Sequence, residues 1–171
     1  MRIVSLLLLS IHLFGGSLFE NISTFQADFR QVVTSDNTNI VYQGEIYIKK
    51  PNLLFWKYQA PVRKLVYILN SRLFIVEPDL EQVIIRNISK IDRFIEILNQ
   101  SKKVSENRYI ANIDNREYLI TLHNEKLHRI IYNDELDNRV EITFSNVKTN
   151  IELENSIFTP QIGEEFDRVY Q

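Results

Sequence analysis

Side chains that commonly perform catalysis are few in this sequence, and their spacing matches no catalytic or metal-binding motif. The chain has no cysteine, which excludes a thiol nucleophile, a disulfide framework and a cysteine-based metal site. Of its three histidines, His12 lies in the apolar N-terminal run, and no carboxylate stands at a zinc-motif spacing from His123 or His128. A glycine-rich phosphate loop and the G-x-S-x-G pattern are also absent. We therefore expect no enzyme, no cofactor and no metal.

Length and charge narrow the function further. At 171 residues the chain has the length of one domain, and its apolar content of 44% is sufficient for a core. The 20 basic and 22 acidic side chains nearly cancel, which argues against nucleic acid as a partner.

The first 17 residues have the pattern of an export signal. Arg2 provides a positive start, residues 3–14 form an apolar run, and residues 15–17 are small. The run is shorter than the ~20 apolar residues of a spanning helix. We expect residues 1–17 to be removed, with an uncleaved anchor as the alternative, and residues 18–171 to form a single periplasmic domain. Because the signal has no cysteine to carry a lipid, we expect no lipid anchor.

The most informative stretch is Gly44 to Pro61, which predicts a hairpin. Ile46 and Ile48 alternate with other side chains in the period-2 pattern of a strand. Pro51-Asn52 ends that strand, because proline cannot donate to a ladder. The next strand, 53–58, is apolar on both faces, unlike an ordinary half-solvated strand. Its second face packs either against another layer of the protein or against an apolar partner, and the pattern fits both.

Similar strands continue along the chain at intervals of about 8–12 residues, which predicts one large antiparallel sheet, sandwich or barrel. The expected strands are 25–34, 40–49, 53–58, 64–69, 73–77, 82–86, 108–113, 117–123, 127–132, 139–146 and 157–160. Short polar turns join them, among them Asn70-Ser71, Asp114-Asn115 and Asn124-Glu125. Residues 161–171 are expected to be a tail, with Phe166 and Val169 as its candidate anchors.

One helix interrupts this succession of strands. Ile88, Ile91, Ile95 and Leu98 recur at helical spacing with Phe94 beside them, and polar side chains occupy the opposite side. We expect an amphipathic helix over 88–100, with Ser89 as a candidate N-cap. A helix inserted between strands of one sheet must lie across that sheet or over an opening.

The strands at 53–58, 64–69 and 73–76 have more apolar faces than one core requires. A sheet that curls around a cavity would use its concave side to hold a hydrophobic ligand, with the helix covering the mouth. The alternative is a filled core in which the same side chains simply pack against one another.

Four segments, in order, resemble those of a known family. They are T-F-Q-A-D-F-R-Q at 24–31, G-E followed by K-K-P-N-L and Trp56 within 44–56, L-F-I with Pro78 and Gln82 within 73–82, and F-T-P at 158–160. The chain resembles the periplasmic outer-membrane lipoprotein carriers, the LolA family. The resemblance covers most of the chain after the signal.

The resemblance implies a mainly β (α+β) fold, an unclosed antiparallel half-barrel with a helical lid, as in LolA and LolB. It implies a monomeric chaperone that takes acylated lipoproteins from an inner-membrane ABC transporter to an outer-membrane acceptor. That acceptor is itself lipidated on an N-terminal cysteine, so a chain without cysteine fits the carrier. The alternative is a lipid-binding or lipid-sensing regulatory domain of the same fold.

The resemblance also suggests site residues. We expect the lipid-binding cavity to include Phe29, Leu54, Trp56, Val66, Ile68, Phe74 and Phe144. We expect the lid to present Ile91, Phe94, Ile95 and Leu98, which match the family by the order of elements. Lys50 falls where the family has an arginine that holds the lid through backbone carbonyls, although a lysine lacks the planar fork of arginine. The alternative for Lys50 is a solvated strand end.

Overall fold

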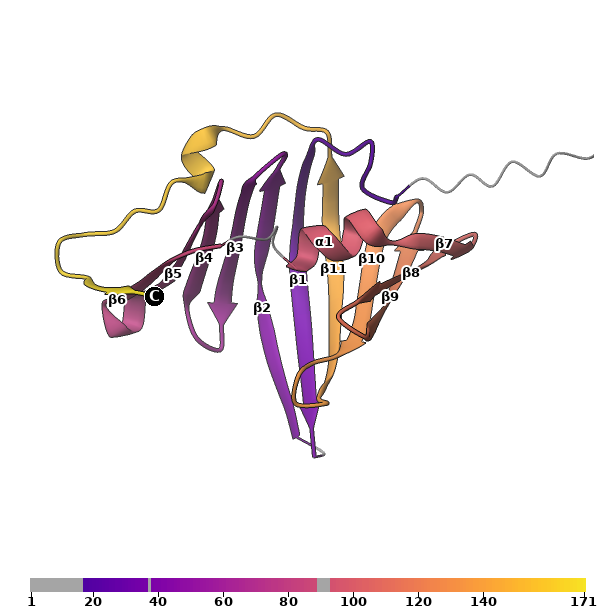
Figure 1. Cartoon of the computed structure of the whole chain (residues 1–171), viewed down its shortest axis with the longest axis horizontal. Helices are drawn as coiled ribbons and strands as arrows, with labels where there is room; N and C mark the ends of the chain where they lie inside the picture. Colours follow the sequence, from indigo (N-terminus) through magenta and orange to yellow (C-terminus); the bar gives the residue numbers. More distant parts are fainter. Residues whose placement is uncertain (1–16, 37, 89–92) are drawn as a thin grey trace, which may run out of the picture.

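The computed structural model describes residues 17–36, 38–88 and 93–171. In these residues one 12-stranded sheet curves around a short helix on its inner side (Figure 1). The strands lie in the order β12-β6-β5-β4-β3-β2-β1-β11-β10-β9-β8-β7. Every neighbouring pair is antiparallel except β12 with β6, which is parallel.

The elements before the helix are β1 (Thr24–Ser35), β2 (Thr38–Lys49), β3 (Leu53–Ala60), β4 (Lys64–Leu69), β5 (Arg72–Glu77), a 3-10 helix (Pro78–Leu80) and β6 (Gln82–Asn87). The helix is α1 (Arg93–Gln100). The elements after it are β7 (Lys102–Ser105), β8 (Arg108–Ile113), β9 (Arg116–His123), β10 (Lys126–Asn133), β11 (Arg139–Thr149), a 3-10 helix (Asn155–Phe158) and β12 (Asp167–Tyr170).

The sheet does not close into a barrel. Strands β12 and β7 stand at its two ends and do not pair with each other. The prediction of a mainly β, unclosed half-barrel with a helix on one side is therefore confirmed. The helix was expected over 88–100; residues 89–92, which include Ser89 and Ile91, lie outside the described part of the chain. No helix of the described residues is long and apolar enough to cross a membrane.

Asparagine and aspartate form the tight turns between strands. Asp114 and Asn115 have φ values of 48° and 61°, and Asn124 has 50°. These side chains tolerate the left-handed conformation that two-residue hairpins require. The predicted turns between β4 and β5, β8 and β9, and β9 and β10 are thereby confirmed.

Three predictions about the ends of the sheet were wrong or incomplete. Residues 157–160 were expected to form a strand, but Phe158 ends a 3-10 helix and is fully buried. The expected tail contains β12, which pairs with the edge of β6. Strand β7 was missed because all four of its residues are exposed, so no apolar alternation marks it.

The C-terminal segment explains why the strands near β4 are apolar on both faces. A second cluster on the outer face centres on buried Tyr67, Val76 and Val83. Ile162 and Phe166, from the segment before β12, pack against it. The outer apolar face is thus covered by the protein itself, and Phe166 is an anchor as expected.

Gly44 permits a close approach between β2 and β3. A Cβ atom at this position would lie 1.8 Å from the Lys57 carbonyl oxygen and 2.9 Å from a ring carbon of Phe29. The register of β2 against β3 shifts between Gln43 and Gly44, so the strand bends there. Gly44 thus lies at a bulge of β2.

We predict that Gly44→Ala destabilises the protein by about 3 kcal/mol, because rigid backbone must move to admit the methyl group. Gly163→Ala is the matched control, since the atoms it would meet belong to the flexible Glu165 side chain. Urea unfolding monitored by circular dichroism measures both. Equal stability of the two variants would contradict the close approach at Gly44.

Candidate functional site

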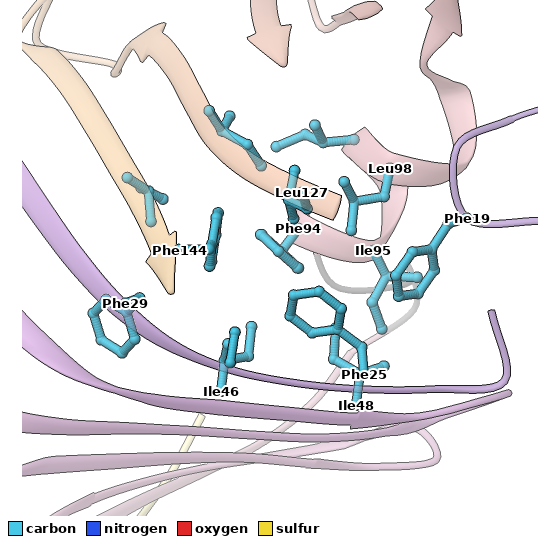
Figure 2. Packing of buried hydrophobic residues seen from close by; sticks show 14 of the residues in the cluster. Phe19, Phe25, Phe29, Ile46, Ile48, Phe94, Ile95, Leu98, Leu127 and Phe144 are labelled. Atoms are coloured by element: carbon cyan, nitrogen blue, oxygen red, sulfur yellow. The ribbon is translucent and has the colours of Figure 1, made fainter. Parts of the chain in front are cut away.

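Helix α1 turns its apolar side toward the concave face of the sheet. Phe94, Ile95, Ile97 and Leu98 are buried, whereas Arg93, Asn99 and Gln100 are exposed. Figure 2 shows Phe94, Ile95 and Leu98 directed toward Phe25, Ile48 and Phe144 of the sheet. The helix is therefore held mainly by burial of its apolar side chains, as its predicted amphipathic pattern implies.

Aromatic rings make the central contact between helix and sheet. The Phe94 ring centroid lies 5.1 Å from that of Trp56 on β3 and 5.6 Å from that of Phe144 on β11. It also lies 6.4 Å from the ring of Phe25 on β1. One helical side chain thus contacts strands from both halves of the sheet.

A partly open cavity of about 230 Å³ remains between α1 and the sheet. Its lining is mostly apolar and comprises Gln31, Leu54, Trp56, Tyr58, Val66, Arg93, Phe94, Ile97, Ile130, Tyr132 and Ile142. Ligand pockets in proteins commonly measure about 300–1,000 Å³. The cavity is therefore small for a large apolar ligand while the helix stays in this position.

Most of the residues predicted for the cavity and lid lie together. Phe29, Leu54, Trp56, Ile68, Phe144, Phe94, Ile95 and Leu98 belong to one buried cluster, and Val66 packs against it. The expected position of Ile91 lies outside the described residues. The other predicted cavity and lid residues, apart from Phe74, thus lie close together on the inner side of the sheet.

Phe74 was wrongly placed in the cavity. It belongs to the outer cluster, in register with Tyr67 on β4 and Ile85 on β6. Its neighbour Leu73 points inward and pairs with Ile68. Successive side chains of a strand point to opposite faces, so a shift of one residue reverses the assignment.

Several inner residues were not among the predicted site residues. They are Phe19, Phe25, Ile46 and Ile48 in the buried cluster, and Gln31, Tyr58, Ile97, Ile130, Tyr132 and Ile142 in the cavity lining. Strand alternation was the signal that would have found most of them. Gln31 and Ile142, for instance, lie two residues from Phe29 and Phe144.

Lys50 binds the N-terminal segment. Its Nζ donates to the carbonyl oxygen of Phe19 and lies 3.5 Å from that of Glu20. The ammonium group also lies 4.8 Å from the centroid of the Phe19 ring. Burial lowers the pKa of Lys50, and the negative charge of Glu20 partly opposes this shift. Lys50 is therefore a donor to backbone carbonyls and not a solvated strand end.

The predicted direct bond from Lys50 to the helix is not found in the described residues, where the carbonyls it binds precede β1. The segment does contact α1 by other groups. The Ser17 hydroxyl donates to the Leu98 carbonyl at 3.2 Å, and Phe19 belongs to the same buried cluster as Ile95 and Leu98. In the part of the chain that the structure describes, Lys50 thus reaches the helix through this segment.

A second contact between α1 and the sheet lies at the start of the helix. Arg93 contacts Asp114 in the β8–β9 turn at 2.6 Å and Glu96 at 3.4 Å. The hydrogen bond that Arg93 donates to the Asp114 carboxylate raises the pKa of Arg93. These groups are largely exposed, and exposed ion pairs contribute at most about 1 kcal/mol. The helix is therefore tied at its edge by contacts that are easily broken.

The described residues contain no group of histidine, aspartate and glutamate side chains arranged to hold a metal. The site offers a mostly apolar volume beneath a helix.

We predict that Lys50→Met loosens residues 18–22 and raises amide hydrogen exchange there and in α1. Lys49→Met is a matched control, because Lys49 donates to the Leu153 carbonyl and the Asn155 side chain instead. Exchange in that variant should rise around 153–158. Indistinguishable exchange at 18–22 in Lys50→Met and the unmodified protein, measured by mass spectrometry, would contradict this role.

Comparison with known proteins agrees with the resemblance found in the sequence. Residues 20–123 match the family model of the outer membrane lipoprotein carrier protein LolA. An outer-membrane lipoprotein carrier protein of Campylobacter jejuni is 33% identical over 160 residues, which cover 92% of this chain and 94% of the relative. One of Wolinella succinogenes is also 33% identical, over 98% of this chain and 99% of the relative.

Solved structures share the fold at low sequence identity. An uncharacterized conserved protein from Thermus thermophilus has a TM-score of 0.59 and 11% identity, covering 90% of this chain and 94% of its own. A LolA superfamily protein from Nitrosomonas europaea has a TM-score of 0.50 and 13% identity, covering 82% and 91%. With the family model and the carrier relatives matching most of its length, the chain belongs to the LolA family of outer-membrane lipoprotein carriers.

Proposed function

We propose that the protein binds the acyl chains of lipoproteins and carries them through the periplasm toward the outer membrane. The observation that carries this proposal is the apolar side of α1 closed over the apolar concave face, with a cavity between them. Membership of the lipoprotein-carrier family supports the choice of cargo.

Transport of acylated lipoproteins requires that their acyl chains be kept out of water, and it requires no catalysis. Each CH₂ group removed from water contributes ~0.8 kcal/mol, so exposure of one long acyl chain costs on the order of 10 kcal/mol. The helix hides four buried side chains, and burial of each is worth about 1.5–3 kcal/mol. Exchanging these side chains for an acyl chain on the same concave face is therefore close to balanced, which permits both uptake and release.

We propose the further steps of transport from the family relationship. An inner-membrane ABC transporter would load the carrier, and an outer-membrane acceptor would unload it. The protein would act as a monomer in the periplasm after removal of residues 1–17. In this scheme Lys50 holds the lid closed indirectly, by fixing Phe19, which belongs to the same buried cluster as Ile95 and Leu98 of α1.

A release assay tests the proposed function. The exported protein is added to spheroplasts that carry labelled lipoproteins and an active transporter. We expect label in the supernatant as a one-to-one complex, because the apolar interior shelters the acyl chains. Absence of release, with folded protein and active spheroplasts, would overturn the carrier function and favour a lipid-sensing domain.

Substitution of the inner side of the helix should abolish release. In Ile95→Asp a charge would occupy the buried side of α1, where desolvation opposes both lid closure and acyl binding. Asn99→Asp adds the same charge on the exposed side and should release lipoproteins normally. Circular dichroism checks that both variants fold. Full release by a folded Ile95→Asp variant would show that the inner side of α1 does not contact the cargo.

A further inference from the structure

Trp56 brings a polar atom into the apolar interior. Its side chain is 9% exposed and lines the cavity beneath α1. The indole Nε1 is buried, and no group of the described residues accepts a hydrogen bond from it. Buried polar groups are nearly always paired, because an unpaired donor loses its bond to water without replacement. The Trp56 N–H is therefore a buried donor without an acceptor among the described residues.

Aromatic rings surround the indole in this state. The centroid of the Phe29 ring lies 5.3 Å from that of Trp56, with an angle of 71° between the ring planes. For Phe94 the distance to Trp56 is 5.1 Å and the angle is 83°. Tyr58 stacks on the indole at 6.0 Å and 7°. An aromatic face accepts a hydrogen bond only weakly, so none of these rings replaces a carbonyl oxygen as an acceptor.

Phe94 is the one of these three rings that comes from the helix. The other two belong to β1 and β3. A movement of α1 away from the sheet would therefore withdraw Phe94 from Trp56. Gln31 and Arg93 line the same cavity, so the part of a ligand that carries polar atoms would have polar neighbours there.

We propose that the Trp56 indole N–H donates a hydrogen bond to the carbonyl oxygen of a bound acyl group. This inference rests on the proposed function and specifies its ligand chemistry. The site selects hydrocarbon chains that bear an ester or amide carbonyl over chains of equal length without one. The bond also fixes the depth to which the chain enters, since the carbonyl marks the start of the hydrocarbon.

A pair of synthetic lipopeptides tests the proposal. Both carry the same glyceryl-cysteine peptide and chains of equal length, joined by ester bonds in one and by ether bonds in the other. The pair differs only in the carbonyl oxygens. We expect the unmodified protein to bind the ester form about five- to tenfold more tightly, as a hydrogen bond to a buried donor would provide.

Trp56→Phe supplies the matched variant. It keeps an aromatic ring beside Phe29, Tyr58 and Phe94 and removes the donor. We expect it to bind the ester and ether lipopeptides equally, so the ratio of the two affinities, and not either affinity alone, is the readout. A variant that still prefers the ester form as strongly as the unmodified protein would overturn the proposal.

The single tryptophan gives a direct spectroscopic readout that needs no variant. In ¹⁵N-labelled protein the indole N–H produces one resonance. Its proton should move downfield with the ester lipopeptide and not with the ether form, because hydrogen bonding to a carbonyl deshields it. Equal shifts or equal affinities for the two forms would overturn the role of Trp56 while leaving lipid carriage intact.

Two further outcomes distinguish the hydrogen bond of Trp56 from the proposed carriage of lipoproteins. Binding of neither lipopeptide would overturn the carrier function itself. A free ester-linked diacylglycerol distinguishes the source of the carbonyl: weaker binding than the lipopeptide assigns it to lipoproteins, and equal binding assigns it to acylglycerols in general. Both results retain the hydrogen bond.

Discussion

Contact between the apolar side of α1 and the concave face of the sheet is the interaction on which the rest of this structure depends. A curved sheet with two unpaired ends cannot cover its own inner surface, so another element must shield Phe25, Ile48 and Phe144 from water. The helix does so mainly with its apolar side chains. Hydrophobic contacts are non-directional, and another apolar surface can replace them with little change in free energy.

The two faces of the sheet are covered in different ways, and this difference determines which face can open. On the outer side, Phe166 is held in place by the backbone pairing of β12 with β6, including the bond from Asp167 N to Glu81 O at 2.7 Å. On the inner side, α1 has side-chain contacts, a hydrogen bond from Ser17 and the exposed ion pair of Arg93 with Asp114. The outer cover is therefore held by a backbone ladder, which the inner cover lacks.

The N-terminal segment before β1 is held by hydrogen bonds to residues that follow β2 and β11. Asn150 accepts a bond from the Ser23 amide at 2.8 Å and donates to the Asn21 carbonyl, while Lys50 binds the Phe19 carbonyl. A lysine is a compact point donor, unlike the planar fork of arginine. Its ammonium group here lies near two backbone carbonyls, those of Phe19 and Glu20. Phe19, fixed in this way, packs on Phe25 beside the helix.

Most of the strands, the Asn- and Asp-based turns, the amphipathic helix and the family follow from the sequence, because periodicity and turn residues are local signals. Which face of a strand is inside does not follow from it and depends on the tertiary structure. Leu73 and Phe74 are both apolar, and alternation cannot tell the interior from an outer face covered by residues ninety positions later in the chain. The same reason applies to β12 and to Lys50, whose partners come from distant segments. Strand β7 is exposed throughout and depends on pairing with β8.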